Sequence, residues 1–513
     1  MSIRPSNESA LHSSVALPAI TPQAVWTHFA TLCRFPRPSK NEGPLRDHLR
    51  QWAMARGLIT VVDGAGNLIV RKAATPGRER VPTVILQAHL DMVCEKNDGV
   101  PHDFTRDPIE PIVRDGWLTA SGTTLGADNG IGVALILAVL AGDALAHGPI
   151  EALLTVDEEA GMGGARGLDG GLLTGRLLLN LDTEEWGQFY LGCAGGMDVD
   201  VRRTGTPTAP PDRYTAWRID LRGLRGGHSG VDIHEQRGNA IKLLVRLLCD
   251  LRRQLPLRLA TLRGGSARNA LPREAFAVVA VPDTPDAPNR PDVPDAPGGS
   301  RDASATLVDR LADWQTVLRQ ELAGIDDDVT LACAATTVSA VMSRAEEAIW
   351  LDSLQAAPHG VHRMSRRLPG VVETSNNLGI VDLRPDGGHC NFMVRSLRDS
   401  GSQALAAEIA SLFALSESQV ACSGHYPGWT PAADSPLLTL CEQVYRQRFG
   451  EQSTRQVIHA GLECGLIAAK IPGLDIVSFG PTIHGAHAPG EAVDIASVDR
   501  CWQLLQAILA AVA

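Results

Sequence analysis

Four short apolar runs constrain the fold of this chain most strongly. Each is nearly continuous, and three of them end abruptly in acidic or histidine residues. Short continuous runs are typical of strands buried on both faces, which form mostly parallel sheets covered by helices. Residues 131–145 suit a crossover helix between the first two strands. The sequence therefore predicts an α/β fold whose sheet contains residues 83–88, 150–156, 176–181 and 474–479.

Polar side chains gather at the carboxyl ends of these predicted strands. Open α/β sheets bind their ligands outside that edge, so four separate chain segments would deliver histidines and carboxylates to one rim. These segments contain His89 and Asp91, the run Asp157-Glu158-Glu159, then Asp182, and finally a loop with His484 and His487.

Most of these groups have a simple alternative interpretation. Asp128 precedes the predicted helix, so it could be an N-cap or, with its two oxygens, a bridge between two cations. The Glu158–Glu159 pair could be a solvated acidic loop, although adjacent carboxylates repel each other unless cations neutralise them. Because consecutive side chains diverge, one glutamate can bind a metal while the other acts as a general base. His89 would then be a ligand, with Asp91 fixing the orientation of its ring.

Counting charges favours a site with two metal ions. Three carboxylates, from Asp128, Glu159 and Asp182, together with two neutral histidines nearly balance two divalent cations and one bridging hydroxide. A single cation would leave an excess of negative charge. Mixed histidine and carboxylate ligands suit zinc, with manganese or cobalt as substitutes. Paired metals are the clamp of aminopeptidase-type hydrolases.

The middle of the chain has a different pattern, with antiparallel strands among amphipathic helices. We expect an α+β lid domain at 197–425, inserted between the two parts of a catalytic domain at 1–196 and 426–513. The Pro/Asp-rich tract at 282–302 should be a disordered surface loop, because it cannot bury a core.

Composition excludes several classes of protein. With 47 Lys and Arg against 58 Asp and Glu, the formal net charge of −11 argues against a nucleic-acid partner. No apolar run is long enough to span a bilayer, and the first residues lack the apolar core of a secretory signal. The ten cysteines include no C-x-x-C pair, which fits reduced thiols in a cytoplasmic protein.

Many ordered segments resemble the co-catalytic di-zinc metallopeptidase family, which includes carboxypeptidase G, tripeptidases and dipeptidases, and most of all its aminoacyl-histidine dipeptidase branch, the cytosol non-specific dipeptidases. The similarity covers nearly the whole chain. It is carried by segments such as LQAHLDMVCEKN, TTLGADNGIG, TVDEEAGMGGA, LNLDTEEWG, RGGHSG, IHAGLECGL and FGPTIHGAHAPGE.

The resemblance implies a role for each matching residue. One zinc would be held by His89, Asp128 and Asp182. The other would be held by Asp128, Glu159 and His487. His487 is chosen over His484 by its spacing to the following Pro and Glu, although the serine that usually follows this ligand is an alanine here.

The remaining implied roles concern catalysis and substrate. Glu158 would be the general base and Asp91 would orient His89. His228 of the lid would bind the substrate carbonyl, reaching it on domain closure or from a partner subunit, unless it is only a loop histidine. The substrate's C-terminal carboxylate would be gripped by Asn269 and Arg395, and its free amine by Glu463; a structural ion pair for Arg395 and a helix cap for Glu463 are the alternatives.

Together these features predict a metal-dependent hydrolase of unblocked dipeptides, including Xaa-His types. A hydroxide bound to two metals would attack the peptide bond. The expected partners are a small dipeptide and a second copy of the chain, joined through the inserted domain, with no nucleic acid and no membrane. The alternatives are an N-acyl amino acid deacylase of the same fold and a catalytically inactive metal-binding regulatory protein.

Overall fold

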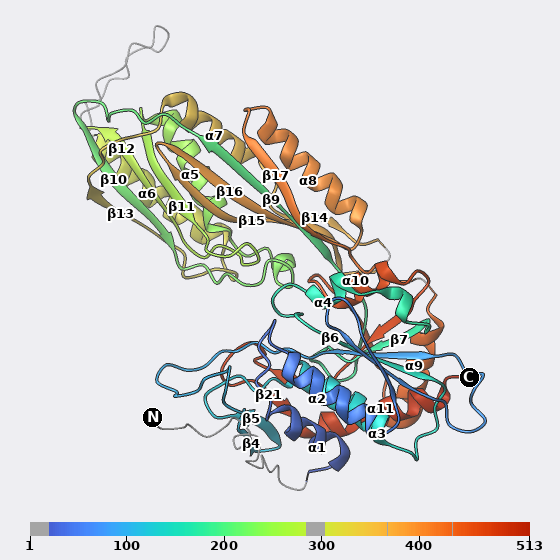
Figure 1. The fold of residues 1–513 in the computed structure, drawn as a ribbon. Coiled ribbons are helices and arrows are strands. Elements are labelled where there is room, and N and C mark those ends of the chain that lie inside the picture. The colour runs from blue at the N-terminus through green and yellow to red at the C-terminus, as the bar shows by residue number, and fades with distance from the viewer. Residues whose placement is uncertain (1–19, 284–302, 367, 433) are drawn as a thin grey trace, which may run out of the picture. The chain divides into compact units, whose positions relative to one another are not determined.

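The chain folds into two compact units. The computed structural model describes residues 20–283, 303–366, 368–432 and 434–513; the expected Pro/Asp loop lies outside them from residue 284 onwards. Unit 1 contains the residues up to Cys193 together with Trp429–Val457 and Leu462–Ala513, and unit 2 contains Ala194–Gly428 and Ile458–Gly461. Figure 1 shows both units with many of their elements labelled.

Unit 1 is built on an eight-stranded sheet in the order β1-β2-β6-β3-β7-β19-β8-β18. The four central strands, β6 to β19, pair in parallel, while β1, β2 and β8 join them antiparallel. All six residues of both β3 and β6 are buried, as expected for strands covered on both faces. The strands are β1 (Ile59–Val62), β2 (Leu68–Lys72), β3 (Val84–His89), β6 (Ile150–Thr155), β7 (Leu177–Asn180), β8 (Gln188–Cys193), β18 (Thr454–Ile458) and β19 (Asp475–Ser478).

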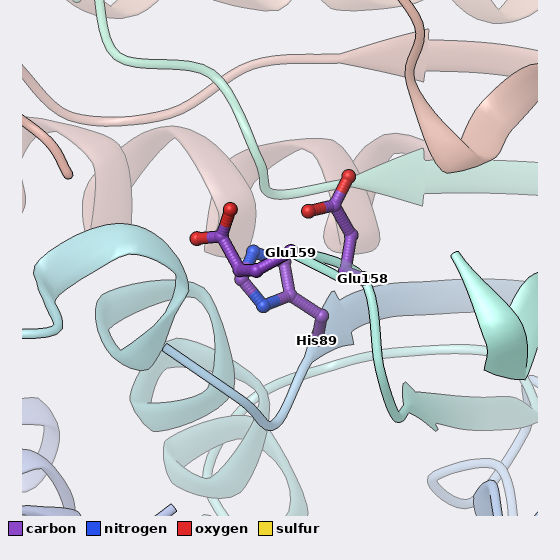
Figure 2. Close-up of side chains that lie close together, drawn as sticks. All are labelled: His89, Glu158 and Glu159. Carbon is purple, nitrogen blue, oxygen red and sulfur yellow. The ribbon is translucent and has the colours of Figure 1, made fainter. Parts of the chain in front are cut away.

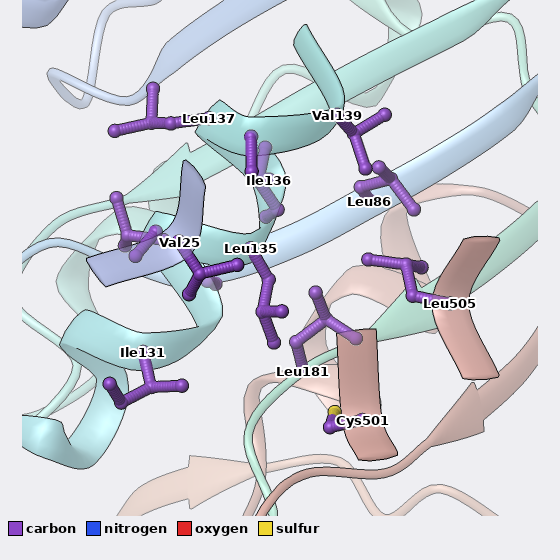
Figure 3. Packing of buried hydrophobic residues seen from close by; sticks show 14 of the residues in the cluster. Val25, Leu86, Ile131, Leu135, Ile136, Leu137, Val139, Leu181, Cys501 and Leu505 are labelled. Atoms are coloured by element: carbon purple, nitrogen blue, oxygen red, sulfur yellow. The ribbon is translucent and has the colours of Figure 1, made fainter. Parts of the chain in front are cut away.

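Helix α3 is the crossover between β3 and β6 and forms the centre of the core (Figure 3). It packs against β3, and α1 and α11 pack against it. It ends at Ala141 rather than at the predicted residue 145, because Gly142 is already extended (ψ 131°). A Cβ on its Gly132 would lie 2.5 Å from the Leu181 carbonyl oxygen, so glycine permits this close approach. The helices of unit 1 are α1 (Gln23–Leu32), α2 (Gly43–Met54), α3 (Ala127–Ala141), α4 (Gly163–Gly167), α9 (Pro436–Phe449), α10 (Glu463–Lys470) and α11 (Ile495–Ala511).

A small four-stranded sheet carries the loop that contains His487. Its order is β20-β21-β5-β4, and all its pairs are antiparallel. The hairpin between β20 and β21 spans residues 485–491, so it begins and ends on paired strands. The strands are β4 (Pro111–Arg114), β5 (Trp117–Ala120), β20 (Ile483–His484) and β21 (Ala492–Asp494).

Unit 2 is a nine-stranded antiparallel sheet whose order is β13-β10-β12-β11-β15-β16-β9-β17, with β14 paired to β15. Its core lies between the sheet and four helices, α5 (Ala240–Gln254), α6 (Ala303–Glu321), α7 (Arg344–Ala356) and α8 (Asp399–Ala414). The strands are β9 (Gly195–Thr204), β10 (Tyr214–Arg222), β11 (Arg258–Gly264), β12 (Ala275–Pro282), β13 (Thr330–Thr336), β14 (Gly360–Met364), β15 (Val372–Arg384), β16 (Gly387–Ser396) and β17 (Gln419–Tyr426).

Among the described helices, none combines the length and the apolar character needed to cross a membrane.

Leu135 tests how far unit 1 depends on the burial of α3. It is fully buried in the centre of the helix, so Leu135→Ala should lower the free energy of unfolding by about 2–5 kcal/mol, measured by denaturant unfolding. Met54, at the exposed end of α2, is the control, and Met54→Ala should change it by less than about 0.5 kcal/mol. Equal effects of the two substitutions would contradict the packing described.

Candidate metal centre

The carboxyl ends of the parallel strands bring the predicted ligands together. His89 is the last residue of β3, and Asp182 follows β7 by two residues. Glu158 and Glu159 follow β6, in a turn stabilised by backbone hydrogen bonds from residues 161–164. Asp128 lies just before the regular part of α3, where its backbone angles are non-helical (φ −79°, ψ 112°). Its two side-chain oxygens lie 3.1 Å from the rings of His89 and His487, which is the contact expected of a bridging ligand rather than of an N-cap.

Two groups of three side chains share Asp128. Its Oδ1 lies 3.1 Å from Nε2 of His89, which is also 3.4 Å from Oδ1 of Asp182. Its Oδ2 lies 3.1 Å from Nε2 of His487, which is also 3.1 Å from Oε2 of Glu159. Within each group the potential ligand atoms lie within 4.8 Å of one another. Each oxygen of Asp128 therefore faces a different histidine, as a carboxylate that bridges two cations must.

His484 lies apart from these groups. Its ring packs against that of Trp117, with 4.8 Å between the ring centroids, and none of the candidate metal groups found among the described residues includes it. Of the two histidines in this loop, the structure brings only His487 to the other ligands.

Asp91 holds His89 and the acidic turn in place. It is fully buried, and its Oδ1 lies 3.4 Å from Nδ1 of His89. Its carboxylate accepts hydrogen bonds from the backbone N–H groups of Glu158 and Glu159, both at 3.1 Å, and from the Ser39 hydroxyl at 2.7 Å. A proton on Nδ1 would face Asp91, which leaves Nε2 of His89 free to bind a metal.

The donor set fits divalent cations. Four carboxyl groups and two histidines meet here, and Oε1 of Glu159 is buried without a hydrogen-bond partner. Burial raises the pKa of Glu158 well above its ordinary value, and it raises the pKa of Asp182 as well. Repulsion from neighbouring carboxylates raises both pKa values further. Cations would neutralise this excess. Figure 2 shows the carboxyl groups of Glu158 and Glu159 diverging beside the His89 ring.

Glu463 lies in a buried layer of polar side chains in the same unit. Its Oε2 accepts hydrogen bonds from Nε2 of Gln87 at 2.7 Å and from the Thr155 hydroxyl at 2.6 Å. Gln87 in turn accepts a bond from Asn180, and Asn180 accepts one from Ser478. The carboxylate is fully buried, and it does not cap α10. Its expected contact with a substrate amine stays a prediction.

In unit 2, Arg395 and His228 form a second polar cluster. Arg395 is 4% exposed and donates a hydrogen bond from Nη1 to the Tyr426 hydroxyl at 2.9 Å. Its Nη2 lies 3.5 Å from Nε2 of His228, and its Nε is buried without a partner. Among the described residues, no carboxylate lies within ion-pair distance of this guanidinium, so Arg395 is not part of a structural ion pair. A buried, unpaired guanidinium is suited to an anionic ligand.

His228 presents an N–H to this cluster. Its Nδ1 accepts hydrogen bonds from the backbone N–H groups of Gly230 at 3.3 Å and Val231 at 3.0 Å, so the proton of the neutral ring is on Nε2. Burial and the nearby Arg395 lower the pKa of His228 to about 4. The adjacent residue Ser229 donates its backbone N–H to the carbonyl of Asn269, which brings the predicted Asn269 beside His228.

His459 also belongs to this cluster, although the residue pattern does not single it out. Its Nε2 lies 2.8 Å from the Ser375 hydroxyl. A Cβ on Gly230 would lie 2.0 Å from the His459 carbonyl oxygen and 3.1 Å from Cδ of Arg395, so the three residues are in close contact. The segment IHAGLECGL, already part of the family resemblance, was the available signal for His459.

Comparison with known proteins assigns this arrangement to a family. The model of peptidase family M20/M25/M40 matches residues 85–511, which is most of the chain. The chain belongs to peptidase family M20/M25/M40. The predicted resemblance is thereby confirmed, as are the fold class and the interpretation of the chain as a metallopeptidase.

Individual relatives match over their full length. The chain is 42% identical over 495 residues to the cytosol non-specific dipeptidase of Escherichia coli (strain K12), covering 96% of this chain and 98% of that one. The crystal structure of aminoacylhistidine dipeptidase from Vibrio alginolyticus matches with a TM-score of 0.86 at 42% identity, covering 98% and 99%. An aminopeptidase from Bacillus cereus ATCC 10987 has the same fold, with a TM-score of 0.55 at 16% identity and coverage of 96% and 99%.

The burial of His459 predicts a loss of stability in acid. Burial lowers the pKa of His459 to about 3, so below its ordinary pKa of about 6.5 the unfolded chain takes up a proton that the folded chain does not. Its contribution to stability is therefore present above about pH 6.5 and is lost as the pH falls, by about 1.4 kcal/mol per pH unit.

Between pH 6.5 and pH 5, the free energy of unfolding of unit 2 should consequently decline less steeply in His459→Gln than in the wild type. The measurement is a denaturant titration at each pH. His362, exposed on β14, is the matched control. Identical slopes in the wild type and in His459→Gln would contradict the prediction.

Proposed function

We propose that this peptidase hydrolyses unblocked dipeptides, including Xaa-His types, with two divalent cations at the metal centre. The observation that carries the proposal is Asp128, whose two oxygens face His89 and His487 separately. The relatives named as dipeptidases support this substrate class, since they match the chain over nearly its whole length. The division into a catalytic domain and a lid domain inserted at 197–425 is part of the proposal.

Five side chains would hold the cations. His89, Asp128 and Asp182 would bind one, and Asp128, Glu159 and His487 the other. Mixed nitrogen and oxygen ligands favour zinc, with manganese or cobalt as substitutes. Such cations polarise a carbonyl and make water acidic enough to supply a nucleophile near neutral pH.

Glu158 would move the proton. It is adjacent to a proposed ligand, and its backbone is fixed by Asp91, yet it is absent from the two groups that share Asp128. As general base it would accept a proton from the attacking water at its carboxylate and then donate it to the nitrogen of the leaving amine. Removing its charge should therefore affect the chemical step more than the binding of metal.

The cluster in unit 2 would recognise the substrate. The Arg395 guanidinium fits the C-terminal carboxylate, because it is buried and has no carboxylate partner among the described residues. His228 remains neutral at physiological pH, and its Nε2–H would donate to the substrate carbonyl. Asn269, beside it, would contribute a further polar contact.

The location and the assembly of the protein stay predictions. All ten cysteines are free thiols, which supports a reducing, cytoplasmic compartment. A homodimer through the inserted domain is expected from the family resemblance.

The proposed function is tested with Glu158→Gln. This variant should lose at least about 1,000-fold in kcat on dipeptides such as Ala-His while retaining its zinc, because only the proton-transfer group is changed. Glu185→Gln, an exposed change in the loop between β7 and β8, is the control and should retain activity.

The substrate class is tested with the wild-type enzyme. Hydrolysis of Ala-His but not of N-acetyl amino acids supports a dipeptidase, whereas the reverse preference would establish the deacylase alternative.

For the variant Glu158→Gln, near-native activity would exclude Glu158 as the base.

A further inference from the structure

The carboxylate of Glu491 is surrounded by backbone amides of the segment that carries Asp128. Its Oε2 accepts hydrogen bonds from the N–H groups of Leu125 at 2.7 Å and Gly126 at 2.8 Å. Its Oε1 accepts from those of Ala127 at 2.7 Å and Asp128 at 3.1 Å. The side chain is 2% exposed. Four consecutive amides therefore converge on one buried carboxylate.

Arg37 binds the same segment from its carbonyl side. Its Nη2 donates to the carbonyl oxygen of Gly126 at 2.6 Å, and its Nη1 donates to those of Leu90 and Asp91, both at 3.0 Å. Like Glu491 it is 2% exposed. Arg37 thus connects the turn after His89 to the segment before Asp128.

Both buried charged side chains, Arg37 and Glu491, hydrogen-bond to Gly126. Its N–H bonds to Glu491 and its carbonyl bonds to Arg37. It adopts a left-handed conformation (φ 71°), and a Cβ here would lie 2.4 Å from Nη2 of Arg37 and 2.8 Å from Sδ of Met92. Only glycine fits this backbone with both contacts in place.

Burying two charges costs free energy unless they are fully hydrogen-bonded. Charge-assisted bonds to backbone groups provide that compensation here. Because these bonds hold the backbone, they determine where the proposed metal ligands carried by that backbone lie. Glu491 also belongs to the hairpin that carries His487, and its own N–H bonds to the carbonyl of Ala488.

We propose that Arg37 and Glu491 are positioning residues that assemble the metal centre before any cation binds. They join three ligand-bearing segments through Gly126: the turn at 89–91, the segment 125–128 and the hairpin 485–491. The proposal rests on the assignment of Asp128 and His487 as ligands under the proposed function, but its test does not depend on turnover.

The main variant is Glu491→Gln. An amide has only one acceptor oxygen, so its NH₂ group would face two backbone N–H donors and at least two of the four bonds would be lost. In chelator-treated, metal-free protein, hydrogen–deuterium exchange of residues 125–128 should become at least about 10-fold faster. Zinc affinity, measured by competition with a chromophoric chelator, should fall by about 10–100-fold.

Glu151→Gln is the matched control. Glu151 is a buried glutamate of the same unit that also accepts two backbone N–H bonds, from Thr174 at 2.8 Å and Gly175 at 3.0 Å. Its substitution should lower stability without changing zinc affinity or exchange at 125–128. A purely structural role for Glu491 would make the two variants behave alike.

Arg37→Lys provides a second test, because lysine keeps the charge but cannot supply the fork that reaches three carbonyls. It should change zinc affinity and exchange in the same direction, and it carries the test if Glu491→Gln does not fold. Combined with Glu491→Gln it should give less than the sum of the two effects, since both act through Gly126. Wild-type exchange and wild-type zinc affinity in either folded variant would overturn the proposal.

Discussion

The parallel pairing of β3 with β6 and β7 is the constraint on which the rest of the site depends. His89, the last residue of β3, pairs with Thr155, the last residue of β6, and β7 ends at Asn180, which pairs with Gln87 two residues before His89. The three strands therefore end within two residues of one another. Residues just beyond these ends must then share one edge. A shift of a single residue would turn each side chain to the opposite face, so the register and the metal site are specified together.

Many carboxylates lie at this edge of the sheet, and the neighbouring backbone supplies hydrogen-bond donors to some of them. Backbone donors hold two buried carboxylates beside the proposed ligands: Asp91 accepts two amides of the acidic turn, and Glu491 accepts four amides at the start of α3. Ligands whose backbone is held in this way suit cations that need a defined geometry. In unit 2 the residues proposed to bind the substrate's carboxylate and carbonyl are instead a positive and a neutral donor, Arg395 and His228.

The sequence predicted the central strands and the ligands because both leave a local pattern. Continuous apolar runs marked β3, β6, β7 and β19, and the polar residues after them marked the site. It could not choose between His484 and His487 from residue chemistry alone, since the choice depends on the β20–β21 hairpin. Arg37 and Glu491 were missed as positioning residues for a related reason. They bind backbone N–H and C=O groups, which every residue except proline has, so no side-chain pattern reveals them.

The number of metal ions bound by each chain tests the central claim most directly. Purified protein loaded with zinc, freed of excess metal and analysed by elemental mass spectrometry should contain two ions per chain, and Asp128→Asn should contain fewer because the shared ligand is weakened. One ion or none in the loaded wild-type chain would contradict the paired site on which this account rests.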